Sequence, residues 1–276
     1  MLNFFKPPIS LKKWVGIAFL LLCFWLFVLT FFYVPTLVRT IFFKDFYLDK
    51  LPFEQATIYV NPEMKKEKRE EIILLYQKSR LRIDSIFGNT ESKPFILVGT
   101  TNEVMQLFGN TDNPTQVKTG MTHLTPFGAY IILSPEGTNI DVLSHELSHA
   151  ELMQRLGWQT RRKKIPIWFD EGLAMLVDKR FEYWKELHSD WKKLTDIETK
   201  NSIFPNHYKK DNKDRFSLQN LQTTEQFFTE DAQVHYFLAQ EEVSRWYRKE
   251  GQQGILELID KLKKQSFEES YYINDK

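Results

Sequence analysis

The stretch Gly128–Ala150, "GAYIILSPEGTNIDVLSHELSHA", decides the fold, because it passes directly from a strand pattern into a helix pattern. Its first part, Gly128–Pro135, is an apolar, β-prone run closed by a proline, which predicts a strand. A helix is predicted next, over Asn139–Leu156, with Gly157 placed to cap its carboxyl end. A strand that leads at once into a packed helix indicates a sheet lying against helices.

The rest of the chain supports this arrangement. Further strands are predicted at Ala56–Pro62 and Pro94–Thr100, separated by a helix that ends at Gly88, and the second half of the chain has mostly helical spacing. Strands followed by helices are typical of the α+β class. The chain has 276 residues, 42% of them hydrophobic, and a formal charge of +1, which suits one medium-sized globular domain. We assign that domain to residues 56–276, and we expect no nucleic-acid partner because no basic stripe with interleaved aromatics occurs.

An uncharged run of 25 residues, Trp14–Val38, lies near the amino terminus. About 20 apolar residues suffice for a helix to cross a bilayer, so the run predicts a transmembrane helix over 14–38. Residues 1–13 would then form a short tail and residues 39–55 a juxtamembrane linker. A cleaved signal peptide is the alternative, but its apolar region is shorter and ends in small residues. An uncleaved membrane anchor is therefore favoured.

The charges that flank this run predict its orientation only weakly, because basic residues are balanced on its two sides. The charge of the amino terminus favours a single-pass protein with that terminus inside and an extracytoplasmic domain. The sole cysteine, Cys23, lies in the run, so the domain has neither disulfides nor thiolate metal ligands.

The motif "HELSH" on the predicted helix has the pattern of a metal site. Residues i and i+4 share one face of a helix, so His145 and His149 can direct both imidazoles at one ion. Glu146 lies beside them, where it can hold a water molecule. The alternative is a surface helix with an accidental pattern, but the apolar residues Leu143 and Leu147 at helical spacing indicate a packed one.

A third ligand is available in "IPIWFDEGLAML", where a helix is expected to start near Pro166. A carboxylate such as Asp170 or Glu171 is costly in so apolar a helix unless it is paired or bound to metal. Alternatively, both are solvated charges at a helix start, stabilised by the helix dipole.

"HELSHA" followed by "IPIWFDEGLA" resembles the gluzincin zinc metallopeptidases, the thermolysin-like or peptidase MA-like domains. The resemblance implies that His145, His149 and Glu171 bind Zn2+ and that Glu146 is general base and acid. It also implies a small mixed sheet whose edge strand, matched to Gly128–Pro135, lies antiparallel to a peptide or protein substrate.

The same resemblance implies an oxyanion donor from the carboxyl-terminal helices. "DAQVHYF" offers His235 and Tyr236, and Tyr236 is preferred. His123, expected in a loop, is a candidate for lining the cleft, although a plain loop histidine is the simpler interpretation.

One position departs from the family pattern. Thermolysin-type enzymes often have an aspartate four residues beyond the glutamate ligand, where this chain has Met175. Support for the histidines must come from elsewhere, and Asp170 and Asp141 are the candidates.

The sequence therefore predicts a membrane-anchored, zinc-dependent peptidase. The competing class is a catalytically silent, peptidase-like binding or scaffold protein of the cell envelope, and the intact set of four site residues favours the enzyme. Substrate identity and oligomeric state are left open by the sequence.

Overall fold

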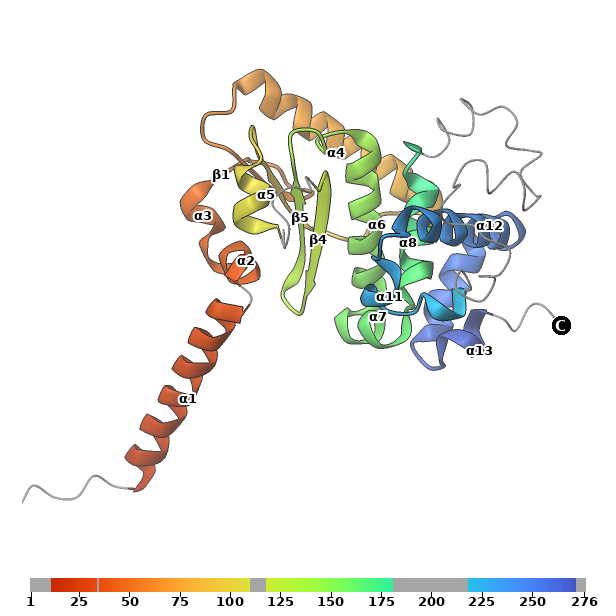
Figure 1. Ribbon diagram of the computed structural model, residues 1–276. Helices are drawn as coiled ribbons and strands as arrows, with labels where there is room; N and C mark the ends of the chain where they lie inside the picture. Colours follow the sequence, from red (N-terminus) through yellow and green to blue (C-terminus); the bar gives the residue numbers. More distant parts are fainter. Residues whose placement is uncertain (1–10, 34, 110–117, 181–217, 272–276) are drawn as a thin grey trace, which may run out of the picture.

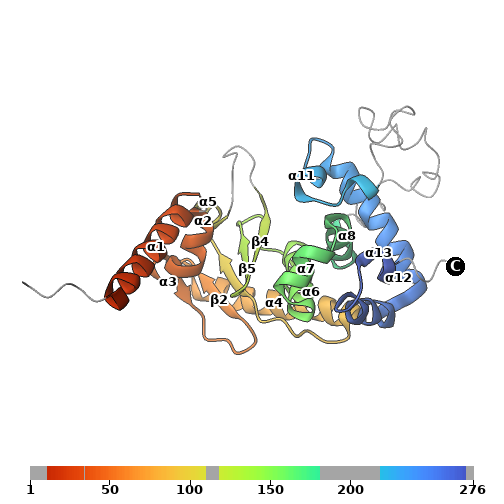
Figure 2. The same ribbon diagram turned by 90° about the horizontal axis from the view of Figure 1, so that it is seen from below.

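The computed structural model describes residues 11–33, 35–109, 118–180 and 218–271. In this part of the chain, a five-stranded sheet lies in the first half and the second half is helical (Figure 1). The protein is therefore α+β with a mixed sheet. Figure 2 shows the same arrangement from below, with the sheet between the amino-terminal helices and the helical half.

The strands follow the order β1-β2-β3-β5-β4 across the sheet. Strands β2, β3 and β5 are parallel neighbours, while β1 and β4 are antiparallel to theirs and form the two edges. Their bounds are β1 Asp49–Lys50, β2 Thr57–Val60, β3 Phe95–Val98, β4 Gly120–Thr125 and β5 Gly128–Leu133.

Side chains alternate between the two faces of the sheet along the central strands, and both faces are apolar. On one face, residues such as Ile96, Val98 and Ile131 pack against α4 (Lys66–Phe87) and α6 (Ile140–Leu156). Helix α6 begins as the sequence predicted, because the Asn139 side chain accepts hydrogen bonds from the main chain of its first turn. It ends before Gly157, whose φ of 77° favours glycine. This face therefore fixes the motif helix against the sheet.

Amino-terminal residues cover the opposite face, together with α5 (Glu103–Phe108). They form α2 (Pro35–Val38), a π-helix (Arg39–Phe43) and α3 (Lys44–Tyr47). The Thr40 hydroxyl donates to the Phe108 carbonyl over 3.1 Å. Residues 39–55, expected as a linker, are thus folded against the sheet as part of the domain.

The predicted transmembrane helix is wrong. The described residues of the uncharged run lie in two helices, α1 (Leu11–Tyr33) and α2, which starts at Pro35. The end of the run lies against the domain, where Val38 is buried. No helix among the described residues is long and apolar enough to cross a membrane. The predicted single-pass topology is wrong for the same reason, and the predicted extracytoplasmic placement of the domain loses the helix on which it rested.

The edge strand also differs from the prediction. Strand β5, which corresponds to the predicted strand Gly128–Pro135, is an internal strand between β3 and β4. The edge on this side is β4, a strand that the sequence did not suggest, and His123 lies in it and not in a loop. The turn that joins β4 to β5 is Pro126-Phe127, which lacks the Asn-Gly or Asp-Gly signature of a hairpin.

The helical half places α8 (Ile167–Val177) between α6 and the long helix α12 (Ala232–Leu262). A positive φ of 64° at Gly251 interrupts the regular geometry of α12. The other described helices here are short: α7 Trp158–Lys164, a 3-10 turn Leu218–Asn220, α11 Thr224–Phe227 and α13 Phe267–Tyr271. Helix α6 is thus in contact with β4 and with α8, and the candidate site lies among these elements.

Candidate metal centre

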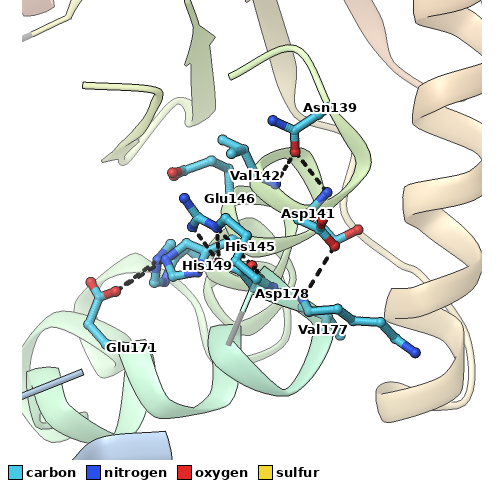
Figure 3. A network of polar contacts seen from close by, with 12 residues as sticks. Asn139, Asp141, Val142, His145, Glu146, His149, Glu171, Val177 and Asp178 are labelled. Carbon is cyan, nitrogen blue, oxygen red and sulfur yellow. Dashed lines mark hydrogen bonds and ion pairs between the residues drawn. The ribbon is translucent and has the colours of Figure 1, made fainter. Parts of the chain in front are cut away.

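Three predicted ligands converge where α6 and α8 pack together (Figure 3). Their ligand atoms all lie within 4.8 Å of one another, and the three residues are buried. The Glu171 Oε2 atom is 3.2 Å from His145 Nε2 and 3.7 Å from His149 Nε2. Ligands held about 2.0–2.2 Å from one ion have this spacing. The buried triad can therefore hold a metal ion.

Gly172 allows α8 to approach α12 closely enough to place its neighbour Glu171. A Cβ atom at Gly172 would lie 2.5 Å from the Ala239 carbonyl oxygen and 2.6 Å from Val243 Cγ2. Both atoms belong to α12, and contacts this short do not occur without a shift of one helix. Only glycine fits this helix crossing.

A carboxylate lies behind each imidazole. His149 Nδ1 is 3.1 Å from Asp170 Oδ2, and His145 Nδ1 is 3.2 Å from Asp178 Oδ2. These contacts are close but are not aligned as full hydrogen bonds. Carboxylates in this position orient a ligating imidazole and increase its basicity. Asp170 was a predicted candidate for this role, and the structure brings it to His149.

Asp178 is the residue that the sequence interpretation missed. It follows Glu171 by seven residues, which is about two helical turns, so it lies on the same side of α8 at its carboxyl end. The seven-residue spacing was enough to predict Asp178 as a neighbour of Glu171, whereas the four-residue spacing of the family pattern pointed to position 175, which is Met175.

Two arginines balance the charge of these carboxylates. Burial disfavours ionisation of Asp178, but its close contacts with His145 and Arg180 lower the pKa of the carboxyl to about 2. Burial also disfavours ionisation of Asp170, yet Arg161 and His149 hold its pKa well below its usual range. Both carboxylates are therefore ionised at neutral pH.

The histidines respond to the same charges. Burial alone would lower the pKa of His145, but Asp178 and Glu171 raise it to about 10. The pKa of His149 is also raised, because the negative charges of Asp170 and Glu171 outweigh its burial. The surroundings of the triad are thus negative and favour a cation between the two rings.

Asp141, the other predicted support, does not contact the histidines in this way. It pairs with Arg82 of α4, at 2.5 Å, and its Oδ1 also accepts from the main-chain N–H of Lys179. Arg82 donates in turn to the Val177 carbonyl over 2.9 Å. Asp141 and Arg82 therefore hold the main chain on both sides of Asp178, as Figure 3 shows in part.

Glu146 is buried beside the triad, and its carboxylate contacts the edge strand. The Thr122 hydroxyl on β4 donates to Glu146 Oε2 over 2.6 Å. Among the described residues, the cluster able to hold a metal consists of His145, His149 and Glu171, so Glu146 is not one of its ligands. It is placed next to the metal site and not in it.

Tyr236, on α12, also lies against the triad. Its ring centroid is 6.3 Å from that of His145. Burial and the negative charges of Glu171 and Glu146 raise the pKa of Tyr236 well above its ordinary value. Its hydroxyl therefore stays protonated and can donate a hydrogen bond.

The two remaining candidates lie elsewhere. His235 is buried, with Nδ1 2.6 Å from the Phe227 carbonyl oxygen at the end of α11. His123 Nε2 is 2.8 Å from the Phe108 carbonyl oxygen, on the sheet face that α5 covers. Burial lowers the pKa of His123, so a neutral ring that donates to this carbonyl is favoured. The contacts of both rings are those of packed histidines.

No protein-family model matches this chain, and a search of the curated proteins finds no match. Its function is therefore inferred from the geometry and chemistry of the site.

Proposed function

We propose that this protein is a zinc-dependent peptidase of the gluzincin type, with His145, His149 and Glu171 as metal ligands. The observation that carries the proposal is the convergence of these three donors, two imidazoles and one carboxylate, on one buried point. Two nitrogen ligands and one oxygen ligand form the set found in catalytic zinc sites that leave a fourth position open. Asp170 and Asp178 behind the rings supply the outer carboxylates that such sites use.

Zinc bound there would act as a Lewis acid that polarises a carbonyl group and makes a water molecule more acidic. The remaining steps belong to side chains of the chain. Glu146 accepts the proton of the attacking water and passes it to the leaving amine. Tyr236, protonated at neutral pH, donates a hydrogen bond to the oxyanion that develops on the carbonyl oxygen.

The open edge of β4 supports a peptide substrate. Within the described sheet, β4 pairs with β5 on one side only, and it carries Thr122 beside Glu146. An extended peptide can add to such an edge through main-chain hydrogen bonds. A peptide aligned on β4 would pass close to Glu146, which Thr122 of that strand contacts.

The test compares two variants that the proposal separates. Glu146→Gln keeps the size of the side chain and touches no ligand atom, so zinc content and thermal stability should stay near wild type. Peptide hydrolysis should fall about 10²–10⁴-fold, the usual contribution of a general base. His149→Ala should lose the metal, the activity and the stability that a bound ion adds.

The measurements are metal content by elemental analysis, thermal unfolding, and cleavage of a broad peptide library. A wild-type protein that binds zinc stoichiometrically but cleaves nothing in the library would contradict the peptidase proposal. That result would favour a binding or scaffold protein with a structural metal.

A further inference from the structure

We infer that Thr122 on the edge strand is a positioning residue that holds Glu146 for proton transfer. The inference rests on the proposed function, because it concerns the general base of that reaction. It assigns a role to a residue outside the motif, 24 positions earlier in the chain and on a different element.

The contact between Thr122 and Glu146 is short and joins the sheet to the motif helix. The Thr122 hydroxyl donates to Glu146 Oε2 over 2.6 Å, a distance typical of a strong hydrogen bond to a carboxylate. Glu146 is buried, with 7% of its surface exposed, and Thr122 is partly buried. Glutamate has three rotatable side-chain bonds, and a bond of this kind restricts them to one arrangement.

Gly120 makes this approach possible. It lies two residues before Thr122, on the same face of β4, because side chains alternate along a strand. A Cβ atom there would lie 2.5 Å from Val142 Cγ1 and 2.9 Å from Glu146 Oε1. The missing side chain lets the strand lie against α6. It also leaves room for Oε1, while Thr122 holds Oε2.

Thr122 is itself held firmly. It is paired with Ile131 of β5 in the sheet, and its β-branched side chain has few rotamers. The next residues of β4 are also held by hydrogen bonds from outside the sheet. The Trp158 indole N–H donates to the Leu124 carbonyl over 3.1 Å, and His123 contacts the Phe108 carbonyl. Glu146 is therefore bonded to a rigid support.

Rigid support matters because proton transfer depends on position. A general base must lie within hydrogen-bond reach of the proton that it accepts. A misplacement of about 1 Å can lower the rate about 10²-fold. The bond at Oε2 keeps the second oxygen in a defined place, where it can accept the proton of the attacking water.

The experiment replaces Thr122 with two residues that differ in the hydroxyl. Thr122→Val keeps the shape and loses the donor, and we expect kcat for peptide hydrolysis to fall about 10–100-fold with little change in KM. Thr122→Ser keeps the donor and should retain most of kcat. Thr57→Val, the same change in β2 across the sheet, is the matched control and should behave as wild type. Zinc content should be equal in all of them, because Thr122 is not one of the ligands.

Two further measurements separate positioning from a general structural role. In the Glu146→Gln background, Thr122→Val should cause no additional loss, since both changes act on one step. In crystals of the metal-free variants, the Glu146 carboxylate should leave its place in Thr122→Val and keep it in Thr122→Ser.

The inference is overturned if Thr122→Val keeps the wild-type kcat, or if its loss adds fully to that of Glu146→Gln. It is also overturned if the loss of activity follows a loss of zinc or of folded protein. If the wild-type protein hydrolyses no peptide, the proposed function is refuted, which is a different result from the failure of this inference. The crystal comparison still decides in that case whether Thr122 positions Glu146.

Discussion

Replacing Asp178 with asparagine tests the carboxylates behind the metal site. The change keeps the size of the side chain and removes its negative charge. Asp178 Oδ2 is 3.2 Å from His145 Nδ1 and is also bound by the guanidinium of Arg180. The variant therefore removes the carboxylate beside the His145 ring and leaves Arg180 without its counter-charge close to the candidate metal site.

The structure gives the expected size of the effect. Losing an outer carboxylate on a ligating histidine typically lowers metal affinity 10–100-fold. This corresponds to about 1.4–2.7 kcal/mol of binding free energy. Because Arg180 is left uncompensated as well, we expect a value in the upper half of this range.

The assay is zinc affinity, measured by competition with a chromogenic chelator. Asp260→Asn is the matched control, since Asp260 is exposed and pairs with Lys263 on the surface of α12. The control should bind zinc as wild type does. If folded Asp178→Asn binds zinc with wild-type affinity, the carboxylate does not support His145 and the reasoning is refuted.

Three other predictions concern Gly172, Arg82 and His123. Gly172→Ala should lower the free energy of unfolding by about 1–3 kcal/mol in urea titrations, because its Cβ would lie 2.5 Å from the Ala239 carbonyl oxygen. Unchanged stability would show that α8 and α12 can move apart without cost. Arg82→Met removes the ion pair with Asp141 and the hydrogen bond to the Val177 carbonyl, so the main chain beside Asp178 should become less rigid. We expect zinc affinity to fall less than tenfold and the free energy of unfolding to fall by about 1–3 kcal/mol in the same titration. Tighter zinc binding would contradict this reasoning. Burial, together with the charge of a nearby lysine, lowers the pKa of His123 in the folded protein. As the pH falls below about 6.5, His123 is therefore protonated in the unfolded chain before it is protonated in the folded protein. The free energy of unfolding decreases over this pH range, down to the lower pKa of the folded state. His123→Gln keeps a donor for the main-chain carbonyl and should give a shallower fall in unfolding free energy between about pH 7 and pH 5, whereas identical pH profiles would exclude this role.

Local sequence patterns predicted the motif helix well. Its start at Asn139 and its end before Gly157 depend on hydrogen bonds and a backbone conformation within a few residues. The i, i+4 spacing then places His145 and His149 on one face of this helix, independently of how the helix packs against other elements. The sequence motif also named Glu171 as the third ligand, but its approach to the histidines depends on the packing of two helices, and the structure brings the three together.

The amino-terminal segment shows where local patterns mislead. An uncharged run suggested a membrane helix and a linker, because hydropathy along the chain carries no information about what the segment packs against. In the folded protein, the residues that follow α1 cover a face of the sheet, where Thr40 bonds to the main chain of α5. The apolar character at the end of the run serves an internal contact.

The sequence by itself determined the chemistry and the local geometry of this site: two histidines on one helical face, a glutamate beside them, and a carboxylate on a second apolar helix. Tertiary structure alone decided which strand is the edge, that Thr122 holds Glu146, and that Asp178 supports His145 while Asp141 binds Arg82. The physical reason is the distance along the chain between the residues that make contact. Helix geometry fixes neighbours three or four residues apart, whereas contacts between elements depend on how whole faces pack, and packing is a property of the complete fold.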